Sequence, residues 1–210
     1  MRSLVLCATL VVAMARPAIA GFIIPNPANC TIPASILLVG SDGSSADPLG
    51  TFSVTVRDYD NHPIGNSGVT IRFSVCTYSG ICQQQFGIIT DCPNREVTVF
   101  TSFVSGVATF TLIGAASPVD CPSDSPGCAA IYADGLFLGN ANVAALDLDG
   151  SPGLTGGDLA AWLGGYFCGS SSPRLDTNGD GLITGGDLSL WLSAFFGGRS
   201  VNGCAAMLCK

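Results

Sequence analysis

A segment of 21 residues occurs twice in the last third of the sequence, and this repeat constrains the fold more than any other feature. The first copy, DLDGSPGLTGGDLAAWLGGYF, begins at Asp147. The second copy, DTNGDGLITGGDLSLWLSAFF, begins at Asp176, 29 residues later. A duplicated unit of this length predicts two copies of one small supersecondary structure.

Each copy opens with the ligand spacing of a twelve-residue calcium loop, in which oxygen ligands converge and position 6 needs a glycine. In the second copy, positions 1, 3, 5, 7, 9 and 12 hold Asp176, Asn178, Asp180, the Leu182 carbonyl, Thr184 and Asp187, and Gly181 stands at position 6. In the first copy the same ligand positions hold Asp147, Asp149, Ser151, Gly153, Thr155 and Asp158. All six acidic residues between 144 and 210 fall on these positions. Because clustered carboxylates repel one another unless a cation neutralises them, we expect Ca²⁺ to be part of the fold.

The first loop departs from the pattern at two positions. Ser151 replaces the acid at position 5, and Pro152 stands at position 6. Proline is fixed at a negative φ and cannot make the turn that a glycine makes there. We therefore expect Gly153 to make the turn one residue later, and a distorted or weaker calcium site.

Each loop leads into a short apolar periodicity that predicts a helix. The spacing i, i+3, i+4, i+7 is occupied by Leu159, Trp162, Leu163 and Tyr166, and again by Leu188, Trp191, Leu192 and Phe195. Two such stripes can pack against each other, and we interpret both tryptophans as core residues rather than a ligand platform. A competing interpretation of the loops is that Thr155 with Asp158, and Thr184 with Asp187, are only helix capping boxes. Capping alone leaves the acids that open the second loop unexplained.

The duplicated loops, with Asp at position 12 and no helix before the loop, resemble a type I dockerin over residues 146–198. That resemblance implies a small α-helical calcium module and a protein partner, which in dockerins is a cohesin. Here Gly156-Gly157 and Gly185-Gly186 stand where recognition hydroxyls are usual, and the basic helix residues are absent. These departures argue against a cohesin and leave another extracellular protein, copies of this chain or docking within the chain as the alternatives.

Residues 34–143 differ from the repeats in their sequence pattern, because β-branched or aromatic residues alternate there with small polar ones. The predicted strands span 34–40, 50–58, 68–75, 95–101, 106–114, 128–135 and 136–145, and turn residues separate them. This pattern favours an antiparallel β-sandwich. The segments Arg57-Asp58, Pro63-Ile64, VTIRF at 69–73, GVATF at 106–110 and AIYADG at 130–135 resemble bacterial immunoglobulin-like domains of the invasin and intimin kind. The predicted fold is mainly β, with an immunoglobulin-like β-sandwich over 21–143 and a dockerin-like helical module over 144–210.

The first 20 residues read as a cleaved secretory signal peptide. Arg2 precedes an apolar run that is too short to span a bilayer, and Ala18-Ile19-Ala20 has the form of a signal peptidase site. No later segment is apolar enough to span a membrane, so we expect an exported, extracellular or cell-surface protein that begins near Gly21.

Nine cysteines remain after the signal peptide, and in an exported chain this density predicts disulfides. With a single histidine, His62, and no CxxC motif, a zinc or haem site does not fit. Because nine is odd, we expect one unpaired thiol, placed in the C-terminal part. Cys121 with Cys128 is a plausible local bridge, and Cys168 is a candidate partner for Cys204 or Cys209.

The amino-acid composition argues against some classes of function. The formal net charge of −7, with only 11% charged residues, argues against nucleic-acid binding, which needs basic patches. No recognised catalytic motif occurs, so we do not expect an enzyme. We predict a secreted calcium-binding surface protein that mediates attachment to another protein. The alternative is a self-assembling subunit of an extracellular filament or layer, with residues 21–33 as a donor strand, and a third class is a carbohydrate-binding sandwich.

Overall fold

The computed structural model describes residues 23–117, 125–204 and 209. The predicted signal peptide, Cys121 and part of the predicted donor strand lie outside these residues. The strands are β1 (Ser35–Leu38), β2 (Thr51–Thr55), β3 (Gly68–Arg72), β4 (Ser79–Ile81), β5 (Ile89–Asp91), β6 (Glu96–Phe100), β7 (Val107–Thr111), β8 (Gly114–Ala116), β9 (Ala129–Ala133) and β10 (Leu136–Ala145). The helices are α1 (Gly156–Phe167) and α2 (Gly185–Gly197), with short 3-10 turns η1 (Pro48–Gly50) and η2 (Pro173–Leu175). No helix in these ranges has the length and apolarity needed to cross a membrane.

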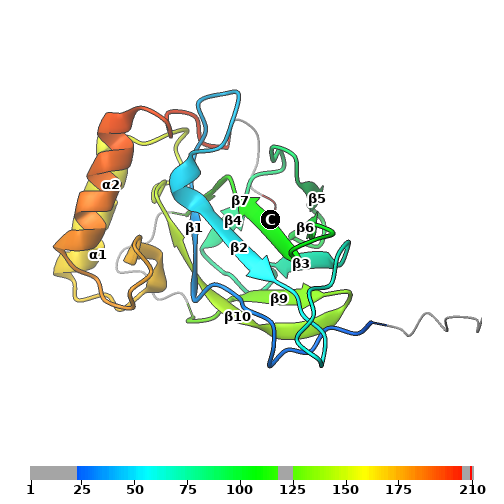
Figure 1. The fold of residues 1–210 in the computed structure, drawn as a ribbon. Coiled ribbons are helices and arrows are strands. Elements are labelled where there is room, and N and C mark those ends of the chain that lie inside the picture. Colours follow the sequence, from blue (N-terminus) through cyan, green and yellow to red (C-terminus); the bar gives the residue numbers. More distant parts are fainter. Residues whose placement is uncertain (1–22, 118–124, 205–208, 210) are drawn as a thin grey trace, which may run out of the picture.

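The strands form one sheet of six and two ribbons of two, and the two helices lie together at one side of the sheet (Figure 1). The order in the large sheet is β1-β10-β9-β3-β6-β5, and the ribbons are β2-β7 and β4-β8. Each of the seven predicted strand ranges contains an observed strand, so the mainly β fold is confirmed. A two-sheet immunoglobulin-like sandwich is not confirmed, because the described strands belong to three sheets.

Alternation along the strands explains how the β part builds its core. In β3, Val69 and Ile71 are buried, while the intervening Thr70 is half-buried and faces the other side of the strand. In β7, Ala108 and Phe110 are buried in the same way. These four side chains belong to one hydrophobic cluster. The β2-β7 ribbon and the large sheet therefore share a core.

Strands β1 and β10 run parallel over Ser35–Leu38 and residues 142–145, and most residues of this paired part are buried on both faces. Their inward residues on one face, such as Leu38, join the main core. On the other face Leu37 and Leu146, which directly follows β10, pack with Trp191 of α2 in a second cluster. This two-sided burial accounts for the nearly continuous apolar runs in both segments, as is usual for buried parallel strands. The first predicted calcium loop begins at the residue after Leu146, Asp147.

The disulfides differ from the local pairings predicted from the sequence. The observed bridges are Cys76–Cys128, Cys82–Cys204 and Cys92–Cys209. The predicted Cys121–Cys128 bridge is wrong, since the Cys76 and Cys128 Cα atoms lie 4.9 Å apart and their sulfurs are bonded. Neither Cys204 nor Cys209 pairs with Cys168, although Cys168 is itself disulfide-bonded. Among the described cysteines the free thiol is Cys30, in the β part rather than the C-terminal part.

Candidate metal centre

Both predicted helices form, and each begins with a reciprocal capping box. Thr155 and Thr184 are the N-caps; each hydroxyl accepts a hydrogen bond from a backbone N–H of the first turn. Asp158 and Asp187, three residues later, accept the N-cap N–H at 2.7 and 2.8 Å. Both carboxylates are completely buried. Both capping boxes are therefore present, and the same two residues close the predicted calcium loops.

In the first loop, which we call loop 1 (residues 147–158), three carboxylates converge. Asp147, Asp149 and Asp158 each offer an oxygen, and these oxygens all lie within 4.8 Å of one another. Asp158 is fixed there by the backbone N–H groups of Leu148 and Asp149, which donate to its Oδ1 at 2.7 and 3.0 Å. Of the residues the structure describes, this is the acidic cluster with the spacing of a metal site. Carboxylates in this arrangement are the hard oxygen donors that Ca²⁺ takes.

The electrostatics of loop 1 favour a cation. Asp147 is 2% exposed. Burial, followed by the negative charges of Asp158 and Asp149, raises the pKa of Asp147 from 3.8 to about 8. The hydrogen bond from Gly150 N–H to Asp147 Oδ1, at 2.8 Å, acts in the opposite direction but is outweighed. Without a cation this carboxyl group therefore keeps its proton at neutral pH.

Two further features of loop 1 agree with the sequence analysis. Gly153 has a φ of +79°, so it makes the turn that Pro152 cannot make. The Ser151 Oγ, at the position of the missing acid, is buried and has no hydrogen-bond partner. A buried hydroxyl normally finds a partner, and here a cation at the centre of the loop would supply it. The residues present thus fit a calcium ion in loop 1.

The second loop, loop 2 (residues 176–187), has the expected backbone but a different side-chain arrangement. Gly181 has a φ of +86°, as position 6 requires. Asp176 is buried and accepts N–H groups from Gly179 and Gly181 at 2.8 and 2.9 Å. Burial is the main reason that its pKa is raised. Asn178 Nδ2 donates to Asp180 Oδ2 at 3.0 Å, so these two exposed ligand candidates bind each other.

The other predicted ligands of loop 2 are Leu182, Thr184 and Asp187, and Asp187 alone among them is buried. Leu182 is 65% exposed, and its N–H donates to Asp180 Oδ1 at 2.8 Å. Thr184 Oγ1 contacts Asp187 Oδ2 at 3.4 Å. Asp187 Oδ1 accepts the Asn178 N–H at 3.1 Å, which brings the first and last thirds of the loop together. Loop 2 contains all the types of oxygen ligand that a cation needs. Its sequence matches the calcium-loop pattern better than that of loop 1, but its carboxylates lie less close together than the three of loop 1.

Sequence reasoning missed one neighbour of loop 1, the segment Ser200–Cys204, which we call the tail. The Leu154 N–H donates to the Ser200 carbonyl at 3.1 Å. A Cβ on Gly203 would lie 2.9 Å from Asp147 Oδ2. The only signal in the sequence was Cys204 itself, because a disulfide at that position must bring the tail to some other part of the chain.

His62, the single histidine, lies apart from these loops. Its side chain is 74% exposed, and Nδ1 lies 3.5 Å from Asp58 Oδ2 in the same turn. Both tryptophans are core residues, as predicted, since Trp162 and Trp191 are 1% and 0% exposed, whereas Tyr166 and Phe195 of the same stripes are exposed.

Comparison with known proteins gives little further information. No family model matches the chain, and no curated protein matches it. Among solved structures, the adhesin InvE of Yersinia pseudotuberculosis is similar at 21% identity, over 57% of this chain and 28% of the adhesin, with a TM-score of 0.23. The chain thus spans just over a quarter of that adhesin. A likeness of this size does not establish an immunoglobulin-like fold, and no comparison matches the dockerin-like repeats.

Proposed function

We propose that this protein is a secreted, noncatalytic surface protein that attaches to another extracellular protein, and that calcium in loops 1 and 2 stabilises its helical part. The observation that carries the calcium proposal is the convergence of Asp147, Asp149 and Asp158 within 4.8 Å, in a loop whose Ser151 Oγ is buried and has no hydrogen-bond partner. Two of the three carboxylates are buried, and a divalent cation relieves the repulsion and the desolvation that they share.

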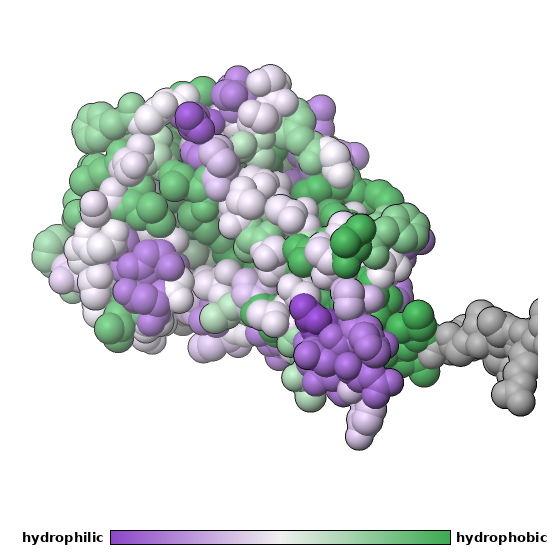
Figure 2. Space-filling view, viewed as in Figure 1, coloured by the Kyte–Doolittle hydropathy of each residue, from purple (hydrophilic) through white to green (hydrophobic). Residues whose placement is uncertain are grey.

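Exposed aromatic residues at the ends of both helices support the attachment role. Phe167 closes α1 and is 79% exposed, and Phe196 near the end of α2 is 81% exposed. Each ring contacts the aromatic residue before it, with ring centroids 5.4 and 5.3 Å apart. Figure 2 shows hydrophobic residues on the outer side of the helical part. Aromatic residues that are rigid and exposed are the side chains that protein interfaces favour.

Calcium titration of the oxidatively folded protein tests the first half of the proposal. After chelator treatment, calorimetry should detect two bound ions, and the melting temperature should rise in millimolar calcium. Asp149→Asn should weaken one site and Asp180→Asn the other, since both side chains are ligand candidates that do not cap a helix. The absence of bound calcium, with identical melting in calcium and chelator, would refute the proposal.

The second candidate function is self-assembly, and one observation favours it. Ile23 and Ile24, at the start of the described chain, are 63% and 62% exposed. Light-scattering mass separates the two functions: an attachment protein is monomeric in calcium, whereas a filament subunit forms large assemblies. Ile23→Ser with Ile24→Ser should leave a monomer unchanged and dissolve an assembly.

A further inference from the structure

The tail covers one side of loop 1. The Leu154 N–H donates to the Ser200 carbonyl at 3.1 Å. Gly153, at its positive φ, lies so close to the tail that an added Cβ would overlap the Val201 carbonyl oxygen. The turn that replaces the position-6 glycine is therefore packed directly on tail backbone.

The same segment also reaches the first ligand candidate of the loop. Gly203 is buried, and a Cβ there would lie 2.9 Å from Asp147 Oδ2 and 2.8 Å from the Gly153 nitrogen. Both distances are below 3.0 Å, which real Cβ atoms do not show, so residue 203 must be glycine for the tail to sit here. Asp147 is thus held between its own loop and the tail.

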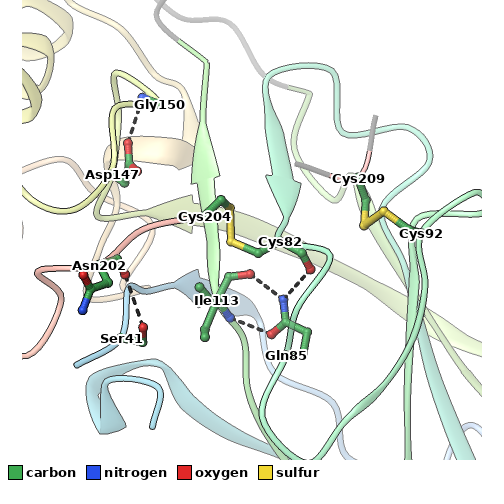
Figure 3. Close-up of a disulfide and its surroundings, with 10 residues drawn as sticks. All are labelled: Ser41, Cys82, Gln85, Cys92, Ile113, Asp147, Gly150, Asn202, Cys204 and Cys209. Atoms are coloured by element: carbon green, nitrogen blue, oxygen red, sulfur yellow. Dashed lines mark hydrogen bonds between the residues drawn. A yellow bond between two sulfur atoms is a disulfide. The ribbon is translucent and has the colours of Figure 1, made fainter. Parts of the chain in front are cut away.

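On its other side the tail is attached to the β part. Ser41 and Asn202 exchange two backbone hydrogen bonds, of 2.8 and 3.0 Å. Cys204 is bonded to Cys82, which directly follows β4. Figure 3 shows this disulfide, the contact between Ser41 and Asn202, and Asp147 with its Gly150 contact in one neighbourhood.

Among the described residues, no part of the tail packs against the glycines of loop 2. A Cβ on Gly181 would meet nothing within 4 Å. A Cβ on Gly179 would approach the Ser35 side chain of β1, at 3.1 Å, rather than any tail residue. The two loops therefore depend on different surroundings, although their sequences are repeats.

We propose that loop 1 is a composite calcium site, in which the tail positions Asp147 and Gly153 and the Cys82–Cys204 disulfide fixes the tail. This inference rests on the proposed calcium function. Pro152 cannot make the turn that a glycine at position 6 would make, and packing against the tail instead holds the backbone of loop 1 in place. Outer partners that orient a metal ligand usually contribute 10- to 100-fold to metal affinity. Breaking the disulfide should weaken loop 1 by about that factor and leave loop 2 unchanged.

The test follows loop 1 in an Asp180→Asn background, in which calcium binding at loop 2 is expected to be weakened. Calcium affinity is compared by calorimetry between this background and its Cys82→Ser/Cys204→Ser form. A matched control, Cys76→Ser/Cys128→Ser, removes a disulfide that does not hold the tail. The expected result is a 10- to 100-fold loss in the first variant and a much smaller change in the control, with circular dichroism confirming that both are folded.

A second pair of variants keeps all the disulfides, in case their removal unfolds the protein. Gly203→Ala should push the tail away from Asp147 and weaken loop 1, whereas Gly164→Ala, in α1 at a position with open space outside both loops, should not. If the parent protein binds no calcium, the proposed function itself fails. If the parent binds two ions and neither the Cys82→Ser/Cys204→Ser form nor Gly203→Ala weakens loop 1, only the composite site is refuted.

Discussion

The indole nitrogen of Trp191 donates a hydrogen bond of 2.8 Å to the carbonyl oxygen of Leu146. Trp191 lies in the helix that follows loop 2, whereas Leu146 directly precedes loop 1. The counterpart is Trp162, in the helix after loop 1, whose indole nitrogen donates to the carbonyl of Leu175 at 3.2 Å. Leu175 directly precedes loop 2. Each helix is therefore hydrogen-bonded, through its tryptophan, to the residue that directly precedes the loop of the other repeat.

Replacing one tryptophan should affect the opposite loop. Trp191→Phe leaves the buried Leu146 carbonyl without its donor and should lower the free energy of unfolding by about 1–3 kcal/mol. It should also weaken calcium at loop 1 more than at loop 2, and Trp162→Phe should do the reverse. Denaturant unfolding and calcium titration of both variants measure these effects. A loss confined to the loop of the same repeat would contradict the crossed arrangement.

Calcium binding to loop 1 should release a proton at neutral pH. The ion-free protein has an Asp147 pKa of about 8, because the group is buried beside Asp158 and Asp149. Calcium affinity should therefore rise with pH up to about 8 and level off above it. Calorimetry in buffers of different ionisation enthalpy measures the released proton. Asp147→Asn should abolish the release, and a pH-independent affinity between pH 6 and 8 would contradict this prediction.

The same group sets the direction in which pH changes the stability of the ion-free protein. Between the ordinary pKa of 3.8 and about 8, the folded state binds a proton at Asp147 that the unfolded state has released. By linkage, the contribution of this group to stability falls as pH rises through that interval. Urea unfolding in chelator at several pH values measures the slope. Asp147→Asn should flatten it.

Asp42 should respond to pH in the opposite direction. The backbone N–H groups of Ser44 and Ser45 both donate to Asp42 Oδ1 at 2.8 Å, and with their hydroxyls they lower the pKa of Asp42 to about 2. Its stabilising contribution is fully present above its ordinary pKa of 3.8 and is lost as pH falls towards 2. Carbon-13 NMR of the carboxyl group measures the midpoint directly. A midpoint close to 4 would show that the turn does not bind the carboxylate.

The oxidised protein should carry one free thiol, at Cys30. Its Sγ is half-buried and accepts the Arg57 N–H at 3.4 Å, so alkylation should be slow but complete without reductant. Iodoacetamide labelling followed by intact-mass and peptide analysis should find a single label at Cys30. Cys30→Ser should take up none, and a label at Cys168 would contradict the observed bonding.

Much of the secondary structure could be predicted because it depends on residues that are close together in the sequence. The apolar stripes and the Thr-x-x-Asp caps identify α1 and α2, and Gly153 replaces Pro152 as the turn residue, as expected. The three strands that sequence reasoning missed, β4, β5 and β8, have three residues each. A strand as short as Ser79–Ile81, with a glycine at its centre, has no alternation to detect.

The long-range relations could not be predicted, since they depend on which distant backbones meet. Cys128 has Cys121 close by in sequence but is bonded to Cys76, because β3 and β9 are neighbours in the sheet. The tail reaches loop 1 through a β-bridge to Ser41, and no local pattern marks that contact. The sequence also suggested that loop 2 was the better site, whereas among the described residues the closely gathered carboxylates are those of loop 1.

The parallel pairing of β1 with β10 has a consequence for how the protein is made. Synthesis proceeds from the N-terminus, so β1 waits without its partner until residue 145 exists, and such non-local pairing slows folding. Cys76, Cys82 and Cys92 are close together in sequence, and all three are synthesised before their partners Cys128, Cys204 and Cys209. Any bond that forms early among these three is non-native and must be exchanged for the observed bonds.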